Sequence, residues 1–93
     1  MQLTYHQDPG HGWVEVPLSL LERLNLLGKI SAFSYVDADK RLAYLEEDAD
    51  LSLFMHVAKD HDITPRLCEL HCNSYHWIRE LPRFENNHHL NWS

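Results

Sequence analysis

Four residues with the chemistry of zinc ligands lie close together in the last third of the chain. Cys68 and Cys72 are separated by four positions, with His71 between them and His76 four residues further on. Thiolates and imidazoles are the usual zinc ligands. On a strand, however, Cys68 and Cys72 face one side of the sheet and His71 faces the other. A packing role for the two thiols is therefore favoured, and a zinc or histidine-based site at these four residues is the alternative.

Carboxylates form a second candidate set. Residues 37–50 carry six acids and two bases, which is a net charge of −4. Some of these acids suit a hairpin turn or a helix N-terminus, where a carboxylate offsets the partial positive charge. A solvated face is the simpler interpretation, but such a set also attracts basic partners. The acids predicted to bind a partner are Asp37, Asp39, Glu46, Glu47, Asp48 and Asp50.

Aromatic residues are numerous for a chain of this size, with three Trp, four Tyr and three Phe. Trp13 and Phe54 are expected in the core. Trp and Tyr are also the residue types that dominate binding hot spots. Trp77 and Phe84, which lie near two arginines, are therefore predicted to belong to the same partner-binding surface.

The eight histidines give weaker signals. His6 and His11 flank a turn that contains Asp8, which is the best local His/Asp neighbourhood in the sequence. A surface turn is favoured there over an acid/base pair. Neither a phosphate loop, a dinucleotide fingerprint nor a nucleophile elbow is present. The sequence therefore predicts no enzyme and no cofactor.

Length and charge limit the classes of function further. The 93 residues make one domain, expected over residues 1–84 and followed by a polar tail at 85–93. Eight basic against fourteen acidic residues give a net charge of −6, which argues against direct binding of nucleic acid. The N-terminus lacks a signal peptide, and the apolar stretches are too short for a membrane span. With reduced thiols, this predicts a cytoplasmic protein.

The elements that must position these residues follow from periodicity and turn signals. Apolar alternation predicts strands over 2–6 and 12–16, and then over 30–36, 41–45 and 66–72. Leucines at helical spacing after Pro17 predict a short helix that Gly28 ends. A second helix begins in the acidic run at 46–50 and ends near His61, and a short helical turn lies at 75–81. The order ββαββαβ predicts an α+β fold, with a mostly antiparallel sheet and two helices packed on one face.

Two sequence motifs carry a resemblance. GHGWVEVP at residues 10–17 and YLEEDAD at residues 44–50 are joined by ISAFSY at 30–35 and IRELPRF at 78–84. Over about residues 1–85 the chain resembles a group of small proteins from bacterial phages, plasmids and other mobile elements. Small acidic proteins of that kind are often anti-CRISPR or antirestriction inhibitors that act by binding, so the resemblance implies such a role.

These observations lead to one expected function. The protein is expected to bind the basic surface of a host defence complex or another nucleic-acid-binding protein in the bacterial cell, and to occlude it. Its acids would engage the Lys and Arg that otherwise hold phosphates. The alternatives are the metal-binding module described above and a homodimeric accessory protein.

Overall fold

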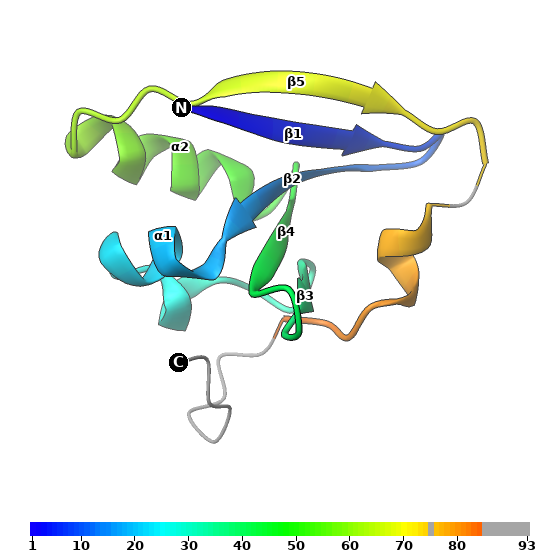
Figure 1. Cartoon of the computed structure of the whole chain (residues 1–93), viewed down its shortest axis with the longest axis horizontal. Helices are drawn as coiled ribbons and strands as arrows, with labels where there is room; N and C mark the ends of the chain where they lie inside the picture. Colours follow the sequence, from blue (N-terminus) through cyan, green and yellow to red (C-terminus); the bar gives the residue numbers. More distant parts are fainter. Residues whose placement is uncertain (75, 85–93) are drawn as a thin grey trace.

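The computed structural model describes residues 1–74 and 76–84 and contains a five-stranded mixed sheet with two α-helices (Figure 1). In chain order the elements are β1 (Gln2–Gln7), β2 (Gly12–Pro17), α1 (Leu18–Arg23), η1 (Leu27–Lys29), β3 (Tyr35–Asp37), β4 (Leu42–Glu46), α2 (Leu51–Asp60), β5 (Arg66–His71) and η2 (Trp77–Glu80). The predicted α+β class is confirmed. The polar tail expected at 85–93 lies outside the described residues. Across 1–74 and 76–84, the helices are too short or too polar to span a bilayer.

The strands lie in the order β3-β4-β2-β1-β5. The two predicted hairpins, β1 with β2 and β3 with β4, form antiparallel pairs, and β2 also pairs antiparallel with β4. After α2 the chain returns to the far side of β1, where β5 runs parallel to it. The sheet is therefore mixed, with three antiparallel pairings and one parallel pairing.

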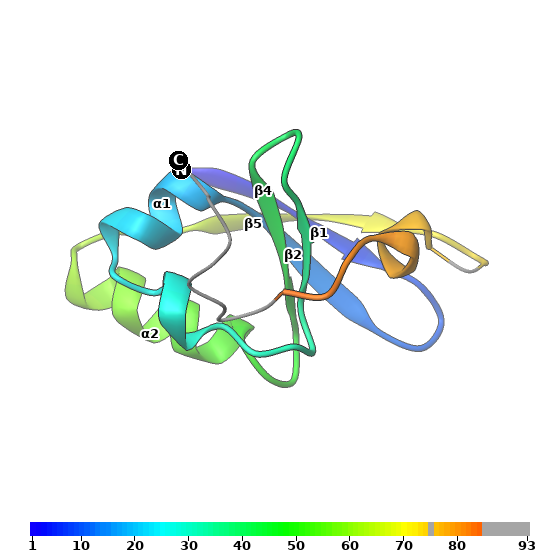
Figure 2. The same cartoon turned by 90° about the horizontal axis from the view of Figure 1, so that it is seen from below.

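One face of the sheet packs against both α-helices, as the sequence predicts. The β2–β4 register sets Val14 opposite Leu45 and Val16 opposite Ala43, so these four side chains share a face. They are fully buried together with leucines of α1 and with Phe54 of α2. Figure 2 shows α1 and α2 together on one side of β2 and β4, with η2 on the other side.

The opposite face has a core of its own. Trp13, Tyr35 and Tyr44 alternate with the helix-facing residues and pack against Ile78 of η2. The prediction that Trp13 and Phe54 are core residues is confirmed, and the two side chains lie in different cores on opposite faces. The short η2 segment therefore covers this face of the sheet, as α1 and α2 cover the other face.

Helix α1 ends earlier than predicted, and Gly28 is not the residue that ends it. Asn25 adopts a φ of 60° directly after the helix. Its N–H donates to the carbonyl of Glu22, and the N–H of Leu26 donates to the carbonyl of Leu21. This pair of bonds is the Schellman motif, which needs a residue with a positive φ at this position. Gly adopts such a φ most readily, and Asn is the next best residue type. Gly28 lies within η1 instead.

The third strand is also shorter than the expected 30–36. Only Tyr35–Asp37 is a strand, because the preceding residues bond to Asp50 rather than to a neighbouring strand. The Asp50 carboxylate accepts from the backbone N–H of Ser31 at 3.0 Å, from the Ser31 hydroxyl at 2.8 Å and from the Ser34 hydroxyl. Local side-chain hydrogen bonds of this kind compete with strand pairing. The helix expected to begin in the acidic run begins after it, at Leu51.

Gly12 permits a close approach between β1 and β2. A Cβ at this position would lie 2.6 Å from the Tyr5 ring and 2.7 Å from its hydroxyl. That hydroxyl donates to the Glu47 carboxylate, at the start of the turn that leads to α2. The missing side chain therefore lets a ring on β1 reach the end of β4.

Gly12→Ala should reduce the free energy of unfolding by about 1–3 kcal/mol, because the Tyr5 ring must move and lose its bond to Glu47. Gly28→Ala is the matched control, since no atom lies within 4 Å of its added Cβ. It should change stability by less than about 1 kcal/mol. Urea denaturation of both variants measures the difference, and equal losses in the two would contradict this role of Gly12.

Candidate functional site

A pocket of about 540 Å³ lies on the face of the sheet that η2 covers. Four segments that are distant in the sequence form it: the β1–β2 loop with the start of β2, the residues that lead into β3, the end of β4 with the turn that follows, and the region from η2 onward. The lining mixes aromatic rings with charged groups of both signs, and it consists of His11, Trp13, Phe33, Tyr35, Glu46, Asp48, Ala49, Arg79 and Arg83.

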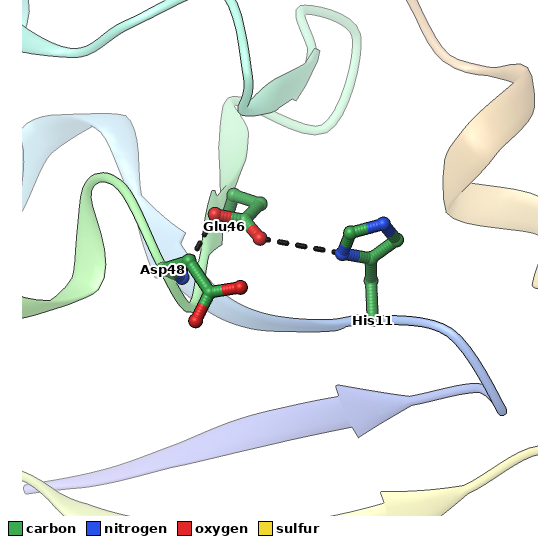
Figure 3. Close-up of side chains that lie close together, drawn as sticks. All are labelled: His11, Glu46 and Asp48. Carbon is green, nitrogen blue, oxygen red and sulfur yellow. Dashed lines mark hydrogen bonds and ion pairs between the residues drawn. The ribbon is translucent and has the colours of Figure 1, made fainter.

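One wall brings an imidazole and two carboxylates together (Figure 3). His11 Nδ1 lies 3.4 Å from Glu46 Oε1, and the Asp48 N–H donates to Glu46 Oε2 at 2.8 Å. One ligand atom from each of the three side chains lies within 4.8 Å of the other two. Glu46 is buried, whereas His11 is half exposed and Asp48 is exposed. The group is therefore anchored on its inner side and open to solvent on its outer side.

Strand register creates this wall. Trp13 of β2 pairs with Glu46 of β4, and the Glu47 N–H donates to the carbonyl of Gly12 at 3.0 Å. His11 precedes Gly12 and Asp48 follows Glu47, so both residues lie at the same edge of the sheet. The Glu46 N–H donates to the Ser34 hydroxyl at 2.9 Å, which ties the end of β4 to the Asp50 network.

Arginines form the opposite wall. Arg79 donates twice to Asp8, from Nε to Oδ2 at 2.7 Å and from Nη2 to Oδ1 at 3.0 Å, and its guanidinium lies 5.0 Å from the Trp13 ring centre. Arg83 lies 4.8 Å from the Tyr35 ring centre and donates to the carbonyl of Ala32 at 3.1 Å. The aromatic floor therefore carries two stacked cations.

Asp8 joins the two walls. Its carboxylate also accepts from the backbone N–H groups of Gly10 and His11, both at 2.9 Å. The bonds from Arg79 and from these backbone groups hold the pKa of the Asp8 carboxyl well below its usual range. The expected surface turn is present, and the Asp8 side chain pairs with an arginine rather than with either flanking imidazole ring.

The predicted acidic surface is divided by the fold. Asp37 and Asp39 lie at the turn between β3 and β4, whereas the other four acids follow the opposite end of β4. Asp50 is 3% exposed and Glu46 is 7% exposed, and both carboxylates accept hydrogen bonds from neighbouring residues of the fold. Asp48 is exposed and lines the pocket, whereas Glu47 is half-buried and accepts a hydrogen bond from the Tyr5 hydroxyl. The six carboxylates therefore do not form one patch.

The two aromatic residues predicted to contact a partner, Trp77 and Phe84, differ in their exposure. Trp77 is 48% exposed and stands on η2 against the rings of Tyr44, His6 and His76. Phe84 is fully buried in the helix-side core, so it has no surface to offer a partner. Its burial follows from a bond between the Phe84 N–H and the carbonyl of Ser34, which holds this segment against the start of β3.

The alternative zinc quartet is not brought together. Cys68 is exposed beside Gln2, and His71 pairs with Glu69 at the surface. Cys72 lies near the Ser74 hydroxyl, and His76 is buried at the start of η2. Within residues 1–74 and 76–84, only His11, Glu46 and Asp48 bring three ligand groups close enough to share an ion.

Sequence reasoning therefore missed the residues at the centre of the pocket as a group. It weighed His11 only against Asp8, and it took Glu46 and Asp48 as part of a charged run. The signal was present in the two motifs GHGWVEVP and YLEEDAD, which contain all three ligand residues and the paired strands β2 and β4. The register between the motifs is what places the three together.

Comparison with known proteins does not assign the site. No protein-family model, curated protein or solved structure matches this chain. The function proposed below is therefore argued from the geometry of the pocket.

The wall that carries Arg79 depends on a buried imidazole. His76 Nδ1 accepts from the Ile78 N–H at 3.1 Å, which caps η2, and the His76 ring packs against His6 and Trp77. Burial lowers the pKa of His76 below its ordinary value of 6.5, with further lowering by His6 and Arg79 and opposition from Asp8.

Stability should accordingly fall as the pH drops from 7 to 5. Below about 6.5 the unfolded chain takes up a proton on His76 that the folded chain resists, so protonation favours unfolding. His76→Asn keeps a cap acceptor without the titration and should flatten this dependence. His56→Asn, at an exposed position on α2, should not. Urea denaturation midpoints at several pH values measure the pH dependence of stability in both variants. If His76→Asn showed the same pH dependence as the parent protein, His76 would not be its source.

Proposed function

We propose that this protein acts by binding, and that the pocket face receives a basic side chain from a partner protein. The observation that carries the proposal is the joint presence of the Glu46 and Asp48 carboxylates and exposed aromatic surface in one hollow. Phe33, at 65% exposure, stands at its rim. A Lys or Arg side chain could lay its apolar stem on this ring and end at the carboxylates.

The charge balance around the pocket favours a cationic partner. The pocket lining carries two carboxylates, Glu46 and Asp48, and two guanidinium groups, Arg79 and Arg83. Asp8 lies beside the pocket and already pairs with Arg79, so these five groups leave a local net charge of −1.

The size of the pocket also suits a binding role. Its volume of about 540 Å³ falls in the range of ligand pockets, and it is large enough to accept a side chain with part of its loop. Desolvated pockets that take an anchoring residue are typical centres of protein interfaces.

We further propose that the partner is a protein whose basic surface otherwise holds phosphates, as in a bacterial defence complex that handles nucleic acid. The net charge of −6 and the resemblance to small mobile-element proteins support this class. In this proposal the carboxylates at the pocket compete with phosphates for the same basic side chains. Binding would then be salt-sensitive, and nucleic acid would displace the protein.

Asp48→Lys should weaken retention of such a partner by at least about tenfold, because it reverses the exposed charge at the pocket. Asp39→Lys is the matched control, since it makes the same charge change at an exposed hairpin turn at the other end of β4. At physiological salt its effect at the pocket is largely screened and should stay below about twofold. Pull-down from bacterial lysate in buffer with EDTA, followed by mass spectrometry, compares the two.

Several outcomes decide the proposal. It is supported if a nucleic-acid-handling complex is retained by the parent and by Asp39→Lys, is lost with Asp48→Lys, and is released by added DNA or RNA. Equal retention by all three proteins would contradict a role for the pocket. A captured partner that nucleic acid does not displace would contradict the proposed mode of inhibition.

A further inference from the structure

We propose that His11, Glu46 and Asp48 form a binding site for a divalent transition-metal ion of the zinc type. The three side chains supply one imidazole nitrogen and two carboxylate oxygens, which is a ligand set that such ions accept. Their ligand atoms lie within 4.8 Å of one another. The hard ions Ca²⁺ and Mg²⁺ prefer oxygen ligands alone and fit this set less well.

The closest pair has the spacing of two ligands on one ion. At metal–ligand lengths of about 2.0–2.1 Å, two ligand atoms of a tetrahedral zinc site lie about 3.4 Å apart. His11 Nδ1 and Glu46 Oε1 are 3.4 Å apart. This separation is longer than an N–H···O hydrogen bond, which typically spans about 2.7–3.2 Å. The two atoms form an ion pair at a separation that shared coordination of one ion would also give.

The site is supported on its protein side and open on the other. Asp8 accepts from the His11 N–H, and the Asp48 N–H donates to the remaining Glu46 oxygen, so the backbone of the two loops is fixed. The exposed edges of His11 and Asp48 leave room for water or a ligand at a fourth position. Open positions of this kind distinguish a site that exchanges ligands from a closed structural one.

A second observation in the same pocket is a buried polar group that faces no acceptor among the described residues. The indole Nε1–H of Trp13 is buried and has no hydrogen-bond partner among the described residues, although its ring lines the pocket and lies 6.2 Å from the His11 ring. A buried donor without an acceptor destabilises the folded state. A water or ligand oxygen carried by the ion would give it an acceptor.

The metal site rests on its own residues and does not require the proposed partner. Where both hold, the ion and the basic side chain compete for the Glu46 and Asp48 carboxylates. Added Zn²⁺ would then release the partner and EDTA would restore binding. The ion would act as an antagonist of the proposed function.

The test is a titration of the isolated chain, purified without a histidine tag and stripped with EDTA. Calorimetry with Zn²⁺ should give one ion per chain, and Co²⁺ should give visible absorption bands that the same variants abolish. In nitrogen-15 NMR spectra, Zn²⁺ should shift the indole N–H of Trp13. His11→Ala and Asp48→Asn should each weaken Zn²⁺ binding by at least about tenfold.

Two controls keep the result specific. His56→Ala removes another imidazole close to a carboxylate, 3.7 Å from Asp60 on the exposed side of α2, and should leave Zn²⁺ affinity unchanged. The double variant Cys68→Ser/Cys72→Ser tests the rejected quartet and should also leave it unchanged. Circular dichroism confirms that each variant folds.

The proposal is overturned by any of three results: no heat or absorption change up to about 1 mM metal, binding that persists in His11→Ala, or binding that the cysteine variant abolishes. Because no partner is present in this titration, its failure leaves the proposed partner binding to be judged by the pull-down. Retention of a partner that is insensitive to Zn²⁺ would contradict only the competition.

Discussion

The antiparallel register between β2 and β4 determines both cores and the pocket. With Val14 opposite Leu45, the aliphatic side chains face the helices, while Trp13 and Tyr44 face η2. A slip by one residue would exchange the two faces, so that the aliphatic side chains of β2 would face η2 and its aromatic side chain would face the helices. The same register brings the loop before β2 to the turn after β4, which is the origin of the charged wall. Core packing and site geometry are therefore specified by one set of backbone bonds.

The second face depends on charge as much as on apolar burial. Asp8 binds the two loop N–H groups on one side and Arg79 on the other, so a single buried carboxylate holds the β1–β2 loop against η2. A bidentate arginine–carboxylate pair with little exposure is stronger and more directional than a surface ion pair. In this arrangement Asp8 is the carboxylate that pairs with Arg79, while Glu46 and Asp48 line the pocket.

Local patterns were enough to predict the elements that form from local contacts. Both hairpins follow from alternation and turn residues, and α2 follows from apolar residues at helical spacing. The patterns failed where distant residues intervene, as when Asp50 draws Ser31 and Ser34 out of a strand. Phe84 looked like a surface aromatic because nothing nearby in sequence reveals that it packs beside α1 and α2. The site was missed for the same reason, since a register links its two halves across more than thirty residues.

The parallel pairing of β1 with β5 has a consequence for the order of assembly. The β1–β2 hairpin can close through its own turn within microseconds, whereas β5 can dock on β1 only after the intervening residues 8–65 have been brought into place. The segment with η2 packs on β2, β3 and β4 through contacts of similarly long sequence separation, so we expect the arginine wall to form late. A chain caught before that step would display the His11 and Glu46 wall without its cationic counterpart and with Trp13 uncovered. Completion of the fold would therefore add the cationic wall to carboxylates that are already in place.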